Sequence, residues 1–142
     1  DALVEPFLRA RQLYDSVPPA LFDQMAMAAF MAAGSYQRHI ARMKKVYNER
    51  HRLLLDALAE TLANQFHCEP SAAGLSIFAR WKMSRREFEQ TARVFAAQGI
   101  GWHGINHYAA GSMPPAALFA FSHLDAQQIA VFRSRVLSMT LP

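Results

Sequence analysis

The sequence predicts an α+β fold, in which a small three-stranded sheet is covered by helices on one face and preceded by a long helix. Three observations lead to this prediction. Apolar residues recur at helical spacing through most of the first half of the chain. In the second half, apolar and polar residues alternate as in a strand, and turn residues separate the elements. The length of 142 residues is about that of one domain.

Two helices are expected at the N-terminus. Residues 1–16 carry apolar side chains at helical spacing, and the Val-Pro-Pro run at 17–19 ends this helix. Pro19 is suited to the first turn of a second helix, which runs to Met31 and ends at Gly34. Because this second helix is apolar on nearly all sides, we expect it to be buried against something large.

A third, long helix is predicted over residues 36–63, with Ser35 as its cap. At its full length it would span roughly 40 Å, which is long for a chain of this size. Its basic residues favour a solvated face, or ion pairs with a domain outside this sequence, over DNA binding, because no groove-entering motif accompanies them. These residues are Arg38, Arg42, Lys44, Lys45, Arg50 and Arg52.

The second half is expected to contain three strands and two helices. Strands are predicted at residues 75–82, 100–105 and 116–123. Ser84 and Glu87 have the spacing of a capping box and begin a helix that stops at Gly99. Asp125 caps a last helix that runs through residue 139. Its inward residues are expected to be Ile129, Phe132, Val136 and Leu137.

Composition narrows the class of protein. With 52% hydrophobic and 18% charged residues, the chain is too apolar for a disordered protein and too evenly charged for a membrane protein. The single cysteine, Cys68, excludes an internal disulfide and a cysteine-rich metal site and fits a reducing compartment. We therefore expect a cytoplasmic protein with no membrane partner. The net charge of +4 permits nucleic-acid binding without indicating it.

No motif for catalysis or metal binding is found. The six histidines lack zinc-ligand spacing, and no Ser, Cys or Asp lies in a nucleophile motif, so no catalytic residue and no metal ligand are assigned. Cys68 is expected to be a buried structural residue. The loop at residues 101–115 is more informative, because aromatic and polar side chains on a glycine-containing loop are typical of a ligand edge or an interdomain contact. They are Trp102, His103, Asn106, His107 and Tyr108.

A longer pattern resembles a known family. The chain is similar to the C-terminal part of fold-type-I aminotransferase-like proteins, and most similar to the MocR-type branch of the GntR transcription regulators. Segments at 73–75, 99–101 and 120–124 occur in the same order in that family. The residues that carry the resemblance in the first half are Pro19, Gln24, Ala26, Ala28, Phe30, Gly34, Tyr36, His39, Ile40, Arg42, Met43, Tyr47 and Arg50.

The resemblance implies an organisation for the chain and its parent. Residues 1–34 would pack on a large domain outside this sequence, 35–66 would form a connecting helix, and 67–142 would form the α/β small domain. The parent would bind DNA through an N-terminal domain, form a homodimer through its aminotransferase-like region, and bind pyridoxal phosphate. The small domain would close over this cofactor and an amino-acid-like effector, which makes the chain the effector-binding fragment of a transcription regulator.

The same resemblance implies that the fragment is inactive alone. The family's cofactor lysine has no counterpart here, because Lys44, Lys45 and Lys82 lie in other motifs. A covalent bond to that lysine is how such proteins retain the aldehyde. We therefore expect the isolated chain to bind pyridoxal phosphate weakly or not at all.

Two departures from the family's pattern bear on the effector. The stretch 117–121 lacks the Arg with which aminotransferases bind the substrate carboxylate, which favours the regulator branch. Asn106, His107 and Tyr108 match a Ser-Arg-Tyr segment of many regulators, so these three are the candidate effector-binding residues. His107 would replace an Arg, and a neutral imidazole is a poorer partner for an anion.

Two other functions remain open from the sequence. The chain could be the small domain of a true aminotransferase, or a stand-alone protein-interaction module. The first alternative is disfavoured by the missing strand Arg. The second predicts a soluble monomer with no large exposed apolar patch.

Overall fold

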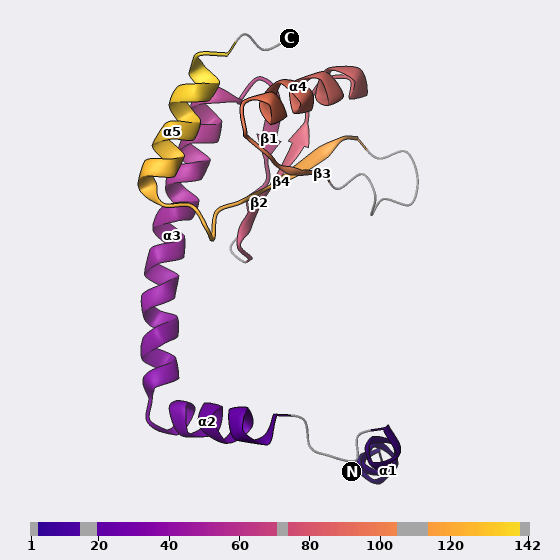
Figure 1. Cartoon of the computed structure of the whole chain (residues 1–142). Helices are drawn as coiled ribbons and strands as arrows, with labels where there is room; N and C mark the ends of the chain where they lie inside the picture. The colour runs from indigo at the N-terminus through magenta and orange to yellow at the C-terminus, as the bar shows by residue number, and fades with distance from the viewer. Residues whose placement is uncertain (1–2, 15–19, 71–73, 105–113, 140–142) are drawn as a thin grey trace. The chain divides into compact units, whose positions relative to one another are not determined.

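The computed structural model describes residues 3–14, 20–70, 74–104 and 114–139 (Figure 1). The chain forms two compact units, residues 1–43 and 44–142, and one helix, α3, has residues in both. The elements, in chain order, are α1 (Val4–Tyr14), α2 (Leu21–Ala32), α3 (Ser35–Thr61), β1 (Phe66–Cys68), β2 (Ser76–Trp81), α4 (Arg85–Ala97), β3 (His103–Gly104), β4 (Ala116–Ala120) and α5 (Ala126–Leu137).

The first unit is helical, and none of the residues described in it is buried. Gly34 separates α2 from α3 with a φ of 68°, a left-handed conformation that glycine adopts without strain. Its amide donates to the Met31 carbonyl at 2.9 Å, which closes the end of α2. The apolar side chains of α2 remain exposed within the described residues; Phe22, for example, is 86% exposed.

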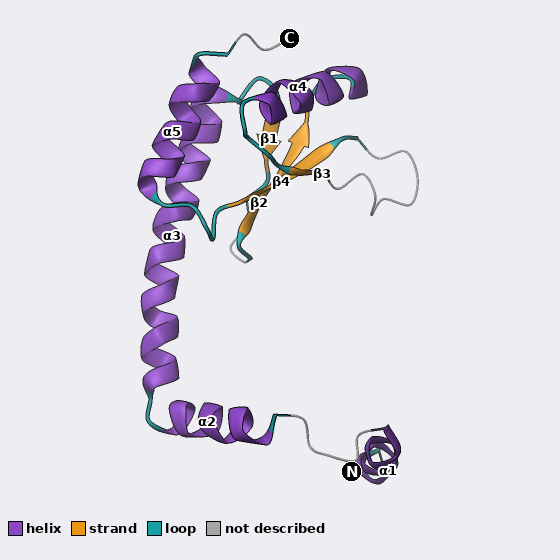
Figure 2. Ribbon diagram, viewed as in Figure 1, coloured by secondary structure: helices purple, strands orange, loops and turns teal. Residues whose placement is uncertain are grey.

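The second unit contains an antiparallel sheet in the order β1-β2-β4-β3 (Figure 2). In β2, buried residues alternate with more exposed ones, as the sequence predicts. Ile77 is paired with Phe119 of β4, and Ala79 with Ala117. These four side chains therefore lie on one face of the sheet, and all four are buried in the core.

Helices cover this buried face. In the core, the sheet residues pack with Leu54 and Leu58 of α3 and with Leu62, which directly follows that helix. Side chains of α4 and α5 complete the core. α5 lies beside α3 (Figure 1), where Arg133 pairs with Glu60 at 2.6 Å. The prediction of an α+β fold with helices on one face of a small sheet is confirmed.

An aromatic cluster forms the centre of the core. The ring of Phe66 contacts four others edge-on, at centroid distances of 4.9 Å from Trp81, 6.4 Å from Phe88, 5.6 Å from Trp102 and 5.3 Å from Phe119. Pairs of this geometry contribute about 0.5–1.5 kcal/mol each beyond their buried area. The cluster joins β1, β2, α4 and β4 to the segment that precedes β3.

Both predicted helix starts in the second half are confirmed. Ser84 and Glu87 form a reciprocal capping box at α4, and Asp125 and Gln128 form one at α5. Each pair satisfies two backbone N–H groups that have no partner within the helix.

Some local predictions are wrong. Among the described residues the sheet has four strands rather than three, because residues 66–68 form β1. The long helix ends at Thr61. The strand predicted at 100–105 is reduced to the two residues of β3 within its described part. Leu137, expected to point inward, is 58% exposed.

Candidate functional site

The three candidate effector-binding residues cannot be placed. Asn106, His107 and Tyr108 lie outside the described residues. Of the other loop residues singled out in the sequence, Trp102 belongs to the aromatic core and His103 is exposed on β3. Trp102 is therefore a structural residue, because its ring packs against Phe95 at 5.0 Å as well as against Phe66.

The face of the sheet opposite the core is the best candidate for a functional surface. We call it the open face. By register, Phe78 of β2, Leu118 of β4 and His103 of β3 lie in one row across it. In the neighbouring rows the open face includes His67, Glu69, Ser76, Arg80 and Ala120. Phe78 and Leu118 are half-buried, so the open face combines an apolar centre with polar edges.

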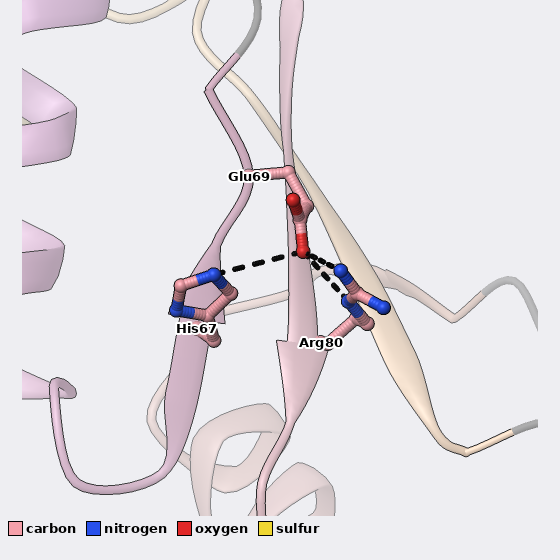
Figure 3. Close-up of polar contacts among 3 residues, drawn as sticks. All are labelled: His67, Glu69 and Arg80. Carbon is pink, nitrogen blue, oxygen red and sulfur yellow. Dashed lines mark hydrogen bonds and ion pairs between the residues drawn. The ribbon is translucent and has the colours of Figure 1, made fainter.

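One edge of the open face has an ion-pair cluster (Figure 3). Oε1 of Glu69 accepts from Nε of Arg80 at 2.6 Å and also from Nη2 of the same guanidinium. The imidazole Nε2 of His67 lies 3.7 Å from the same oxygen. These residues come together because the β1–β2 register pairs His67 with Arg80, and because the Glu69 amide donates to the Phe78 carbonyl.

This cluster limits what the open face can do chemically. Arg80 is already neutralised by Glu69, so it is a weak partner for an incoming anion. The described residues contain no group of three or more His, Cys, Asp or Glu side chains that could bind a metal ion. The open face therefore suits binding by hydrogen bonds and apolar contact better than acid–base or metal chemistry.

A second group of contacts, made by Arg50 and His51, connects α3 with the turn that follows β4. The Nη1 of Arg50, which is half-buried, donates to the Ser122 carbonyl, and its guanidinium lies 5.9 Å from the centre of the Tyr47 ring. The next residue, His51, packs edge-on against Phe121 at 5.3 Å. Arg50 is therefore a structural residue, unlike the exposed members of the basic run such as Arg52, which pairs with Asp56.

The lysines and the cysteine are all in the described part of the chain. Lys44 and Lys45 are exposed on α3, and Nζ of Lys82 donates to the Ala63 carbonyl at 2.6 Å. Cys68 is half-buried, and burial raises the pKa of its thiol, although the positive charge of Lys82 acts in the opposite direction. A raised pKa leaves little thiolate at neutral pH, which fits a structural cysteine.

The chain is similar in sequence to transcription regulators. No protein-family model matches it. Over 106 residues, or 75% of the chain, it is 32% identical to YhdI, an uncharacterized HTH-type transcriptional regulator of Bacillus subtilis. Over 108 residues it is 25% identical to the probable rhizopine catabolism regulatory protein MocR of Rhizobium meliloti. The resemblance to MocR-type regulators is confirmed. The matched region spans only 21% and 22% of these two relatives.

The fold of the MocR-like chain is that of part of an aminotransferase. It superposes on LysN, the alpha-aminoadipate aminotransferase of Thermus thermophilus, with a TM-score of 0.72 and 16% sequence identity. The similarity covers 95% of this chain and 34% of LysN, which was crystallised with N-(5'-phosphopyridoxyl)-L-leucine. Among the described residues, no helix combines the length and apolar character needed to cross a membrane.

Sequence reasoning missed the cluster of His67, Glu69 and Arg80. Its signal was present, because His67 and Glu69 alternate with Cys68 as on a strand, and Arg80 lies on the polar side of β2. This alternation does not by itself identify a strand, because β1 has only three residues and lies shortly after a helix.

Proposed function

We propose that this chain is the C-terminal, effector-binding part of a pyridoxal-phosphate-dependent transcription regulator of the MocR type. One observation carries the proposal. One sequence relative is named an HTH-type transcriptional regulator and the other a regulatory protein, whereas the fold is that of part of an aminotransferase. A DNA-binding protein with an aminotransferase-like region has both properties, and an ordinary aminotransferase has only the second.

In this proposal the open face covers an amino-acid-like effector. Phe78 and Leu118 supply apolar contact, and Ser76 and His103 supply hydrogen-bonding groups at its edges. Asn106, His107 and Tyr108 follow β3 in the sequence and would add further polar contacts to the same ligand. Effector binding regulates the parent only if the ligand prefers one of two arrangements of the small domain.

The lysines present do not fit a covalent pyridoxal phosphate site. Lys44 and Lys45 project from α3 in exposed positions, and the Lys82 ammonium donates a hydrogen bond to the Ala63 carbonyl. Pyridoxal phosphate supplies an aldehyde that forms a covalent bond with a lysine amine. The parent's cofactor lysine would therefore lie in another stretch of the polypeptide, and this chain alone would be inactive.

The exposed apolar residues of α2 support a larger parent. Phe22 and Met25 are 86% and 61% exposed, and surfaces of this kind mark contacts with another protein surface. In the proposal α2 packs on a large domain of the aminotransferase-like region, through which the cytoplasmic parent also forms a homodimer. DNA would be bound by an N-terminal domain outside this sequence.

Transamination by the parent is the second candidate function, because the fold is shared with LysN. The side chains that β4 presents to the open face, Ala116, Leu118 and Ala120, do not include an Arg that could bind a substrate carboxylate. Arg80 of β2 lies on that face but is paired with Glu69. These two observations favour the regulator.

The full-length gene product tests the proposal. We expect its reading frame to encode a winged-helix segment upstream of this chain. We also expect the purified protein to retard its own promoter fragment in a gel, with an affinity that changes when pyridoxal phosphate and a candidate amino acid are added. A parent that binds no DNA and transfers amino groups between amino and keto acids would instead establish the aminotransferase.

A further inference from the structure

A groove runs along α5. It has a volume of about 630 Å³, within the range of small-molecule sites, and lies between α5 and the segment 99–103. It opens beside the end of the β3–β4 pairing, which among the described residues joins His103 to Leu118 and Gly104 to Ala117. All of its lining residues belong to the second unit.

One positive charge, that of Arg135, lies in the lining of the groove. The other titratable residues of the described lining are His103 and His123, and none of the described lining residues is acidic. The nearby Asp125 carboxylate accepts from the Gln128 amide at the start of α5 and is engaged there. Arg135 therefore supplies the positive charge that makes its end of the groove complementary to an anion.

Arg135 marks the end of the groove nearest α4. Its Nη1 donates to the Gln98 carbonyl, at the C-terminal end of α4, at 3.1 Å. This contact orients the guanidinium and uses one of its several N–H donors, so others remain for a carboxylate.

The walls next to Arg135 are apolar. Phe132 lies three residues before Arg135 on α5 and therefore on the same helix face, and Trp102 lines the groove from the other segment. The Trp102 ring is fixed by Phe95 at 5.0 Å and by Phe119 at 5.7 Å. Leu54 of α3 also lines the groove. A rigid aromatic wall of this kind suits a flat aromatic or branched aliphatic group.

We propose that this groove binds an amphipathic monocarboxylate, with the carboxylate at Arg135 and the apolar body between Trp102 and Phe132. The groove shares His103, Leu118 and Ala120 with the open face and extends from there along α5 to Arg135. Binding of such a ligand to the isolated chain does not depend on the chain's being part of a regulator, so the two proposals can fail independently.

The two tryptophans of the chain give a direct readout. Trp102 lines the groove, whereas Trp81 is only 4% exposed in the core, and its indole N–H donates to the Ser84 carbonyl. The full chain, labelled with ¹⁵N, is titrated with 4-phenylbutyrate and with the uncharged 4-phenylbutanol. We expect 4-phenylbutyrate to shift the indole N–H signal of Trp102 saturably and that of Trp81 little. We expect the alcohol to bind about three- to tenfold more weakly.

Variants separate the parts of the proposal. Arg135→Gln is expected to weaken the binding of 4-phenylbutyrate to the level of the alcohol. Gly101→Leu is expected to block both ligands, because a Cβ at Gly101 meets no atom within 4 Å and a side chain there can fill the groove. Arg133→Gln on the same helix, where Arg133 pairs with Glu60, is the matched control and should bind normally.

Three results would overturn the proposal: no shift of the Trp102 signal with either ligand, equal binding of acid and alcohol by the unsubstituted chain, or an unchanged affinity in Arg135→Gln. An unchanged Trp81 signal in each variant shows that the core is intact, so a loss of binding can be assigned to the groove.

Discussion

Thr91 is a buried polar residue whose hydroxyl group has no hydrogen-bond partner among the described residues. It is fully buried in α4. Leaving a buried hydroxyl unpaired costs about 1–3 kcal/mol relative to a paired one. The sequence does not reveal this position, because helical spacing alone does not show whether a buried hydroxyl has a hydrogen-bond partner.

Replacing Thr91 by Val should therefore stabilise the chain. The two side chains have nearly the same shape, and the substitution removes the unpaired hydroxyl, so we expect a gain of about 1 kcal/mol in the free energy of unfolding. Urea denaturation measures it. Thr91→Ser keeps the hydroxyl and loses the methyl group, so it should be destabilising; a Val variant less stable than the natural chain would show that the hydroxyl has a partner.

Arg50 illustrates a residue whose role the sequence obscures. It belongs to a run of basic residues that looks solvated, but its guanidinium bonds the Ser122 carbonyl, 72 positions away in the chain. Only the tertiary structure brings α3 to this turn, so helical periodicity alone could not distinguish Arg50 from Arg52.

The two arginines make a matched pair of variants. Arg50→Met should lower the free energy of unfolding by about 1–2 kcal/mol, because the half-buried Ser122 carbonyl loses a charged donor. Arg52→Met removes only an exposed pair with Asp56 and should change it by less than about 0.5 kcal/mol. Equal effects of the two substitutions in denaturant titrations would contradict a special role for Arg50.

At the scale of elements, local signals in the sequence predict most of the helices and one strand well. The capping box before α4, the Asp125 cap of α5 and the alternation of β2 each depend on neighbouring residues, and each is confirmed. β1 was missed because three residues are too few to establish an alternating pattern. Its position depends on pairing with β2, which is a non-local interaction.

The capping box of α4 also has a consequence for pH dependence. The pKa of Glu87 is lowered, first by the hydrogen bond from the Ser84 hydroxyl and then by that from the Ser84 amide. The ionised carboxylate is favoured in the folded state. The stability that this carboxylate contributes is fully present above the pKa that Glu87 has in the unfolded chain. It is lost as the pH falls through the lower pKa that Glu87 has in the folded chain.

We therefore expect the stability advantage of the natural chain over Glu87→Gln to be largest near neutral pH and to shrink on acidification through this range. Thermal unfolding of both chains between pH 7 and pH 3, on the order of one measurement per half unit, follows it. Glu89→Gln, on the same helix but outside the cap, controls for the loss of a charge. A difference between the two chains that stays constant across this range would argue against the capping interaction.

At the scale of the whole molecule, the sequence shows that α2 is apolar on nearly all sides, and we expect it to be buried against something large. Within the described residues none of its side chains is buried, so this burial stays a prediction. The spacing of apolar residues shows that α2 needs another protein surface to pack against, but it does not identify that surface. The candidate effector residues Asn106, His107 and Tyr108 rest on resemblance and lie outside the described residues.

The isolated chain is accordingly expected to self-associate through α2. Phe22→Ser combined with Met25→Ser should shift sedimentation velocity profiles towards the monomer, because both side chains are largely exposed and apolar. Leu137→Ser replaces an exposed leucine of α5 and should leave the association unchanged. A chain that is monomeric before substitution would contradict this expectation.

In the proposed function, this chain would cover the ligand and another stretch of the parent would hold the cofactor. Borohydride reduction after addition of pyridoxal phosphate, followed by peptide mass spectrometry, tests it directly. We predict one stoichiometric phosphopyridoxyl label on the full-length parent, at a lysine outside these 142 residues, and no comparable label on the isolated chain. A stoichiometric label at Lys44, Lys45 or Lys82 would contradict the account.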